Sequence, residues 1–360
     1  MSTFMQSSLE IITGIILLFG GGELFVQGAT ALALLLGVPQ LVIGLTVVSL
    51  GTSAPELFVS MGSILKNSDA IAVSNVVGSN IFNVLVVLGS SALIMPLKVE
   101  SRLVKRDVPL LLAISTAVWG MASSGQITWQ AGLALLVALV INTIWEIRTA
   151  REEPLGIKEA EPEININHVS IGWSKAIINI ISGIVLLALG SNLLVSGAKF
   201  LASSYGWSEA IIGLTIVSAG TSMPELITSL VASIRGQTDL AIGNVVGSSL
   251  LNQLLVLGSC ALFSGSKGLN VEAILINRDF PIMVLTALAC MPIFWTKGKI
   301  SRREGGILLA LYIVYLADQV LPHTLPTMHN EFRFVVIFFI LPITLIVITF
   351  KTVKYWLRFR

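Results

Sequence analysis

Two glutamates, Glu56 and Glu225, each stand inside a long apolar segment, directly after a proline. The sequences around them are nearly the same, GTSAPEL at 51–57 and GTSMPEL at 220–226. A charged side chain at the centre of a bilayer costs about 2.5–3.5 kcal/mol, and neither segment contains a lysine or arginine that could neutralise it. A divalent cation, two sodium ions or two protons would supply the missing positive charge. We therefore expect these glutamates to bind small cations. Because one kind of cation excludes another from the same carboxylates, the site could exchange them.

Hydroxyl side chains accompany each glutamate at helical spacing. The two sets are Thr46, Ser49, Ser53 and Ser60 around Glu56, and Thr215, Ser218, Ser222 and Ser229 around Glu225. Spacings of three and four residues place each set on one stripe of a helix. Without the glutamates, such a stripe could equally serve close packing between helices. With them, each helix presents one polar edge, and the two edges can face each other.

The proline before each glutamate removes a backbone N–H and breaks the helix. We expect freed carbonyls near Ser49–Gly51 and Ser218–Gly220 to bind an ion, as broken membrane helices do. Thr52 or Ser53 adds a hydroxyl one turn before Glu56. The next segment of each half adds polar side chains, of which the first asparagine could instead cap a broken helix: Asn75, Ser79, Asn83, Asn244, Ser248 and Asn252. Oxygen ligands without His or Cys favour calcium or sodium over zinc or copper.

The composition indicates a membrane protein. Of the 360 residues, 54% are hydrophobic and 12% are charged, and the mean hydropathy is +0.89. A soluble domain of this length could not bury so much apolar surface. The net charge of +2 gives no case for nucleic acid as a partner. Cys260 and Cys290 both lie in apolar runs, which argues against a disulfide framework or a metal cluster.

Eleven apolar runs are long enough to cross a bilayer, which takes about 20 residues. Their centres lie near Leu18, Ser49, Asn83, Ala113, Ala138, Leu187, Ser218, Leu251, Leu285, Leu311 and Phe339. The polar stretch from Arg148 to Asn167 is predicted to be a linker between two halves. Most of the 22 lysines and arginines fall on one side if the N-terminus is outside and the C-terminus inside. The linker then faces the cytoplasm.

An internal repeat relates the two halves. GLTVVSLGTSAPELFVS (44–60) recurs as GLTIVSAGTSMPELITS (213–229), and SNVVGSNIFNVLVVLGS (74–90) recurs as GNVVGSSLLNQLLVLGS (243–259), both at an offset of 169 residues. Five spans precede the repeat point, and because this number is odd the halves enter the membrane from opposite sides. Inverted repeats with broken helices predict a transporter whose site lies at the midplane.

The expected fold is an all-α membrane protein with ten core transmembrane helices. They form two inverted five-helix repeats with broken helices, and an eleventh helix is appended at the C-terminus. The predicted parts are a first repeat at 1–147, a cytoplasmic linker at 148–172, a second repeat at 173–322 and the extra helix at 333–360.

Three further acidic residues receive structural interpretations. Asp107 and Asp279, in the related sequences RDVP and RDFP, are predicted to lie just outside spans and to pair or cap locally. Glu23 is interpreted as interfacial or structural, because its repeat counterpart is Asn192.

The doubled motif resembles the alpha-1 and alpha-2 repeats of the calcium/cation antiporter superfamily. It consists of GTSAPEL and GTSMPEL, each followed by NVVGS, within segments 44–90 and 213–259. The layout is most like the bacterial sodium/calcium exchangers, including the potassium-dependent type, over nearly the whole chain except the linker and the last span. The resemblance implies that Glu56 and Glu225 form the centre of a diamond-shaped ion site. It also implies that the first and sixth spans slide across the others during alternating access.

The resemblance further implies a set of ligands around the two glutamates. They are the carbonyls of Ser49 and Ser218 together with Thr52, Ser53, Thr221, Ser222, Ser79, Asn83, Ser248 and Asn252. One position departs from the family, because many of its members, the potassium-dependent ones especially, have aspartate where this chain has Asn252. Two negative charges instead of three argue against potassium co-transport and for fewer sodium ions per calcium.

The expected function is sodium-driven calcium antiport across a cytoplasmic or plasma membrane, without a cofactor. Proton-coupled antiport of calcium or another divalent cation is the alternative, since the site has two carboxylates and no third. A cation channel could use the same ligands, but inverted repeats of broken helices favour a transporter. An enzyme would need a nucleophile and a base. No histidine lies in a predicted span, and the sequence contains neither a GxSxG nor an HExxH motif, so an enzyme is not supported.

Overall fold

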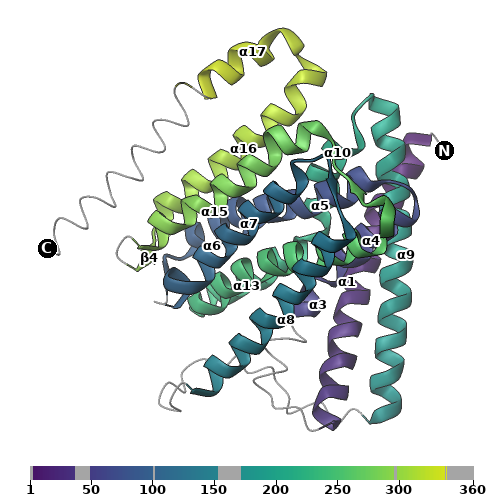
Figure 1. Cartoon of the computed structure of the whole chain (residues 1–360), viewed down its shortest axis with the longest axis vertical. Coiled ribbons are helices and arrows are strands. Elements are labelled where there is room, and N and C mark those ends of the chain that lie inside the picture. Colours follow the sequence, from purple (N-terminus) through teal and green to yellow (C-terminus); the bar gives the residue numbers. More distant parts are fainter. Residues whose placement is uncertain are drawn as a thin grey trace, which may run out of the picture.

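The computed structural model describes residues 3–36, 49–99, 102–152, 172–295, 298–336 and 338. Within these ranges the chain is helical apart from four two-residue strands and short connections (Figure 1). Most of the predicted linker, the start of the second predicted span and nearly all of the eleventh lie outside the described residues.

The two halves contain corresponding elements in the same order. The first half comprises α1 (Thr3–Leu35), α3 (Ser49–Thr52), α4 (Ala54–Leu65), α5 (Asp69–Phe82), η2 (Asn83–Leu88), α6 (Gly89–Ile94), β1 (Leu97–Lys98), η3 (Leu103–Asp107), α7 (Val108–Ala122), β2 (Gln126–Ile127) and α8 (Trp129–Glu152). The second comprises α9 (Trp173–Tyr205), α10 (Glu209–Ile212), η5 (Gly213–Val217), α11 (Ser218–Thr221), α12 (Met223–Ile234), α13 (Thr238–Leu251), η6 (Asn252–Leu257), α14 (Gly258–Phe263), η7 (Gly265–Lys267), β3 (Leu269–Asn270), η8 (Leu275–Asp279), α15 (Phe280–Trp295), β4 (Lys299–Ile300) and α16 (Arg302–Thr324). A further helix, α17 (Pro326–Val335), follows α16.

Seven of the described helices are long and apolar enough to cross a membrane. They cover Met5–Leu32, Asp69–Ile94, Trp129–Arg148, Trp173–Tyr205, Thr238–Phe263, Leu275–Phe294 and Arg302–Pro322. The number rises to eight if the bent pair Glu209–Thr221 and Met223–Ile234 forms one span. The described part of the chain is therefore an all-helical membrane protein, and it includes a broken helix.

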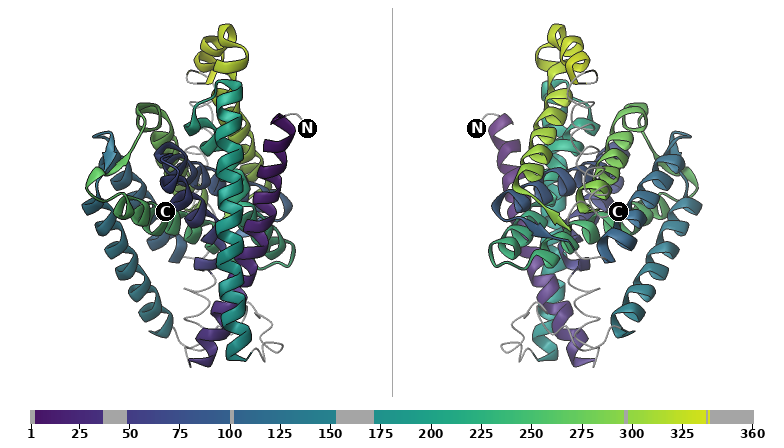
Figure 2. Two further views of the ribbon diagram at one scale, coloured as in Figure 1. Left: turned by 90° about the vertical axis from the view of Figure 1, so that its right-hand side faces the viewer. Right: turned by 90° about the vertical axis from the view of Figure 1, so that its left-hand side faces the viewer.

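Helices α1 and α9, which correspond in the repeat, lie side by side along most of their length (Figures 1 and 2). Glycines allow the close approach. A Cβ atom on Gly14 would lie 2.8 Å from the carbonyl oxygen of Gly190, and one on Gly21 would lie 2.9 Å from that of Gly183. Small residues let membrane helices pack backbone to backbone. The pair therefore forms a tightly packed two-helix unit.

The remaining helices of the two halves interlock. Helix α6 packs on α16 and α8 packs on α14, with glycines at both contacts. A Cβ atom on Gly132 would lie 2.7 Å from the carbonyl oxygen of Gly258, and one on Gly305 would lie 2.5 Å from that of Gly89. Strand β1 pairs antiparallel with β4, and β2 with β3. Each of these contacts joins one half to the other. The contacts form two equivalent pairs, because exchanging corresponding elements of the halves converts α6–α16 into α8–α14 and β1–β4 into β2–β3.

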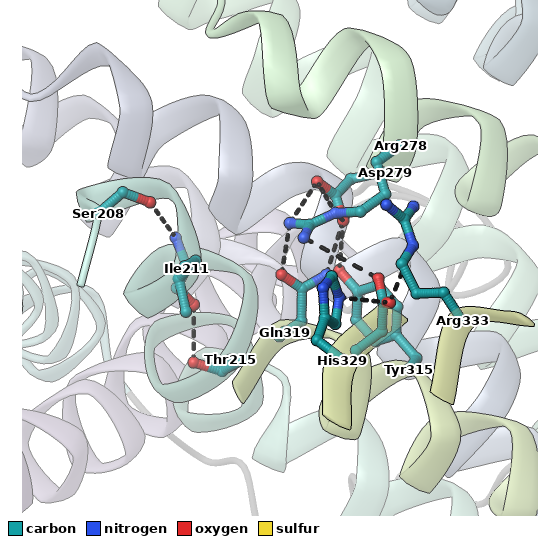
Figure 3. Close-up of polar contacts among 10 residues, drawn as sticks. Ser208, Ile211, Thr215, Arg278, Asp279, Tyr315, Gln319, His329 and Arg333 are labelled. Atoms are coloured by element: carbon teal, nitrogen blue, oxygen red, sulfur yellow. Dashed lines mark hydrogen bonds and ion pairs between the residues drawn. The ribbon is translucent and has the colours of Figure 1, made fainter. Parts of the chain in front are cut away.

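Asp279 lies deeper than the sequence predicts. It is fully buried inside the span Leu275–Phe294, not outside it. The predicted local pairing is present, because Arg278 Nη2 donates to Asp279 Oδ2 over 3.1 Å. Tyr315 and Gln319 of α16 donate to Asp279 Oδ1 over 3.1 and 2.9 Å (Figure 3). The apolar run begins before the arginine, and hydrogen bonds from α16 stabilise the charge at that depth.

The α1–α9 contact leads to a stability prediction. Gly21→Ala should destabilise the protein by about 1–3 kcal/mol, because its Cβ would lie within 3 Å of the α9 backbone. Gly20→Ala is the matched control, since its Cβ would meet no atom within 4 Å. Thermal unfolding in detergent measures both variants. Equal stability of the two would contradict the packing described here.

Candidate cation-binding site

Both motif helices break at the serine three residues before the glutamate. Ser53 separates α3 from α4 with φ −85° and ψ 4°, and Ser222 separates α11 from α12 with φ −85° and ψ 7°. Pro55 and Pro224 stand in the first turn of the new helix, where a missing N–H costs little. The second break bends the chain by 45°. Each glutamate thus lies in the first turn of a helix, where the helix dipole favours negative charge.

Glu56 and Glu225 are both fully buried. Ser222 Oγ donates to Glu56 Oε1 over 2.9 Å. Glu56 Oε2 and both carboxylate oxygens of Glu225 have no hydrogen-bond partner within the described residues. The charge of Glu56 also acts on Glu225. Since a buried, unpartnered carboxylate is strongly unfavourable, a cation or a proton is the natural complement of this pair.

The hydroxyls around each carboxylate come partly from the opposite half. Thr221 and Ser222 of the second half interact with Glu56, while Thr52 of the first half interacts with Glu225. Ser248 also interacts with Glu225. The remaining predicted hydroxyl ligands, Ser53 and Ser79, are buried, and their Oγ atoms have no partner in the described part of the chain. The polar edges of the two motif helices therefore meet in one place.

The predicted ligands Asn83 and Asn252 occupy corresponding positions in the two halves. Each is the first residue of a π-helical turn, η2 or η6, inside a longer helix. Both are fully buried, and neither the amide nitrogen nor the amide oxygen of either side chain has a partner among the described residues. Single π turns inside α-helices are frequent at functional sites. Their unpartnered amide oxygens can bind a cation without adding negative charge.

Asn75 and Asn244 support the site from the next helix. Asn75 Nδ2 donates to Ser60 Oγ over 3.0 Å, and Asn244 Nδ2 donates to Ser229 Oγ over 2.9 Å. Asn244 Nδ2 also donates to the Glu225 carbonyl over 3.2 Å. These bonds hold α5 and α13 against the glutamate helices. Neither asparagine caps a helix end, which was one of the two roles left open by the sequence.

The carbonyl at Ser218 differs from the expectation. It accepts the Ser222 N–H over 3.0 Å and the Thr221 hydroxyl over 3.3 Å, so the break does not free it. The reason is that Pro224 removes the donor for the carbonyl four residues before it, which belongs to Gly220. Ser49 lies at the start of α3. By the same spacing, Pro55 removes the donor for Gly51.

Two buried polar residues beside the site were missed by the sequence reasoning. Gln253 Nε2 donates to Asn80 Oδ1 over 2.9 Å, joining η6 to α5, and both residues are buried. Ser249 Oγ and Gln253 Oε1 lack partners within the described ranges. An available signal was that Gln253 interrupts an apolar run where its repeat counterpart is Val84.

The charge of the site is set by its two glutamates. The described residues contain no group of three or more His, Cys, Asp or Glu side chains that could hold a metal ion. The other predicted ligands are neutral hydroxyls, amides and carbonyls. Such a ligand set suits hard cations, and its two negative charges balance one divalent or two monovalent cations.

Comparisons with known proteins agree with this geometry. The family described as sodium/calcium exchanger protein matches residues 7–148 and 175–321. The sodium/calcium exchanger MaX1 of Methanosarcina acetivorans is 30% identical over 86% of this chain and 97% of its own length. The inner membrane protein YrbG of Escherichia coli is 30% identical over 85% and 94%.

A solved structure gives the same result for the fold. The sodium-calcium exchanger NCX_Mj, soaked with Na⁺ and Sr²⁺, is 30% identical, has a TM-score of 0.59 and is matched over 88% of this chain and 99% of its own. These matches cover both halves and confirm the resemblance carried by the doubled motif. The protein is a multi-pass membrane transporter and not an enzyme. The chain belongs to the sodium/calcium exchanger family.

Proposed function

We propose that the chain exchanges sodium for calcium at a single site centred on Glu56 and Glu225. The observation that carries the proposal is the pair of fully buried carboxylates, three of whose oxygens have no partner among the described residues. The naming of the relative MaX1 as a sodium/calcium exchanger supports the choice of ions. The proposed ligands are the side chains predicted from the sequence, with carbonyls from the predicted stretches Ser49–Gly51 and Ser218–Gly220. Within these stretches, the carbonyls of Gly51 and Gly220 are the ones that lose their helical donor to a proline.

The exchange follows from charge balance. One Ca²⁺ or two Na⁺ neutralise the two carboxylates equally well. Because both ions need the same oxygens, binding of one excludes the other. Both halves supply ligands to the site. This arrangement allows the site to open on one side at a time, as in other inverted-repeat transporters.

The proposed architecture is ten core helices in two inverted repeats, with an eleventh helix at the C-terminus. The matching order of elements, the two matching helix breaks and the paired cross-half contacts support it. We place the protein in a cytoplasmic membrane with the N-terminus outside and the C-terminus inside. The relative YrbG is named an inner membrane protein.

Proton-coupled antiport of calcium or another divalent cation is the second candidate. The unpartnered carboxylate oxygens favour it as well, since two protons would also neutralise the pair. The lack of a third carboxylate, with neutral amides at Asn83 and Asn252, leaves the charge balance open to either coupling ion.

Vesicle transport distinguishes the two couplings. Protein reconstituted into sodium-loaded vesicles should take up radioactive calcium after dilution into sodium-free buffer, because the outward sodium gradient drives exchange. Vesicles with equal sodium on both sides and clamped pH are the control. Uptake driven by a pH gradient alone, in the absence of sodium, would replace sodium with protons as the coupling ion.

Neutralising either carboxylate should abolish exchange. Glu56→Gln or Glu225→Gln is expected to reduce calcium uptake to background and to abolish the thermal stabilisation by calcium, which is about 2.7 kcal/mol at one hundred times the Kd. The folded state should persist, since removing an unpaired buried charge is not destabilising. The exposed Glu331 of α17 provides the control variant, Glu331→Gln. Near-normal exchange by either site variant would refute the site.

Asn252→Asp tests the neutral amide position. A third negative charge should tighten calcium binding by about tenfold or more, as expected for an added opposite charge within a few ångströms, and should change the number of sodium ions per calcium. Isothermal titration and flux ratios measure the two effects. Asn83→Asp is the matched variant in the other half. An unchanged profile for Asn252→Asp would remove Asn252 from the ligand set.

A further inference from the structure

Helix α9 is tied to α4 by side chains at one end of the two-helix unit. Lys66, which follows α4, donates from Nζ to the Asn192 carbonyl over 2.7 Å and to Ser196 Oγ over 2.6 Å, and it also contacts Asn192 Oδ1. Ser191 Oγ donates to the Phe58 carbonyl over 2.9 Å. We call Lys66, Asn192 and Ser196 the outer latch, because the predicted topology places Lys66 outside.

The repeat supplies a second set of residues at the corresponding positions. At the offset of 169, Lys66 corresponds to Arg235, Asn192 to Glu23 and Ser196 to Gln27. In the described part of the chain, no hydrogen bond or ion pair joins Glu23 or Gln27 of α1 to Arg235. Both Arg235 and Glu23 are exposed. Among the described residues, Arg235 makes no side-chain hydrogen bond or ion pair, and Glu23 accepts a hydrogen bond from Gln27 alone, over 3.2 Å.

The two-helix unit also packs asymmetrically on the rest of the protein, because α9 contacts its neighbour more closely than α1 contacts the corresponding helix. Helix α9 packs along α4, whereas any contact between α1 and α12 in the described part of the chain is marginal. Helix α1 instead covers both motif breaks. A Cβ atom on Gly51 would meet Val26, and one on Gly220 would meet Ile15, both of α1. The halves therefore have the same elements in two different arrangements.

Exchanging the arrangements of two inverted repeats gives the state that faces the other side of the membrane. In that state α1 would lie along α12 as α9 now lies along α4. Glu23 would then stand against Arg235, and the outer latch would be open. The predicted topology agrees, because it places Glu23 in the inner part of α1 and Arg235 at the inner end of α12.

We propose that Glu23 and Arg235 form an inner latch, an ion pair that closes only in the opposite-facing state. The proposal rests on the alternating access of the proposed function. An ionisable residue on a membrane helix usually has a specific partner, and Gln27 is a weak one for a carboxylate. An arginine–carboxylate pair is also a charge-assisted interaction, whereas Lys66 has neutral acceptors. Glu23 and Arg235 act by positioning α1, and neither is proposed to touch the ion.

Cysteine crosslinking tests the latch without measuring transport. The background replaces the two buried native thiols, Cys260→Ala and Cys290→Ala. With a short bifunctional thiol reagent, Lys66→Cys/Asn192→Cys should crosslink in the arrangement seen here, and Glu23→Cys/Arg235→Cys should crosslink in the opposite arrangement. The reagent replaces the length of the long side chains, which a direct disulfide could not span. Adding Lys66→Met opens the outer latch and should raise the initial crosslinking rate of the inner pair about two- to fivefold, the range for an exposed pair.

A neighbouring position controls for random collision. Leu24→Cys/Arg235→Cys moves the thiol about 100° around α1 and should remain uncrosslinked. Absence of a Glu23–Arg235 crosslink while the Lys66–Asn192 pair crosslinks would overturn the latch, and so would equal rates for the Glu23 and Leu24 pairs. These readouts do not depend on which ions are carried, so failed sodium/calcium exchange with normal crosslinking would reject only the proposed function.

Charge exchange provides a second test in the native-cysteine protein. Glu23→Arg and Arg235→Glu should each slow turnover, and the double variant Glu23→Arg/Arg235→Glu should restore it, as a directly interacting pair requires. Calcium affinity should be unchanged in all three, because neither residue binds the ion. No restoration in the double variant would count against a direct pair.

Discussion

Two negative charges held inside an apolar helix assembly are the constraint on which the structure depends. Glu56 and Glu225 are fully buried, and most of their carboxylate oxygens have no protein partner among the described residues. Several features make this tolerable. Each helix restarts just before its glutamate, so that its positive end lies near the charge. Hydroxyls from the opposite half approach each carboxylate. In the proposed function, a transported cation neutralises the residual imbalance.

The internal repeat converts one motif into a shared site. Each half contributes one carboxylate and hydroxyls that interact with the carboxylate of the other half. The supporting asparagines, Asn75 and Asn244, make the same bonds in both halves. The site is therefore nearly symmetric at its centre, while the α1–α9 unit packs on it asymmetrically. A symmetric binding site with an asymmetrically packed helix pair fits the two alternative states of the proposed transport cycle, which face opposite sides of the membrane.

The sequence predicted the glutamate pair, the helix breaks and the membrane-spanning character. Charged residues in apolar runs, prolines at fixed positions and a long internal repeat can all be recognised without a structure. It did not predict the π turns at Asn83 and Asn252, since one extra residue in a turn leaves no mark on hydrophobic periodicity. The depth of Asp279 was mistaken because its partners are on α16, which is distant in the chain. Within the predicted stretch Ser218–Gly220, the carbonyl that loses its helical donor is that of Gly220, whereas that of Ser218 keeps one. The ion ligands and the ten-helix count stay predictions.

The strand pairs β1–β4 and β2–β3 have a consequence for biosynthesis. Each joins a segment of the first half to one that is synthesised much later, and the α6–α16 and α8–α14 contacts do the same. Loop closure over such separations is slow and cannot precede synthesis of the second half. The helices of the first half must therefore remain incompletely packed until then, with the glycine faces of α6 and α8 without their partners α16 and α14. Assembly of this protein is thus a late step, and a chain truncated after its first half would lack all four of these contacts.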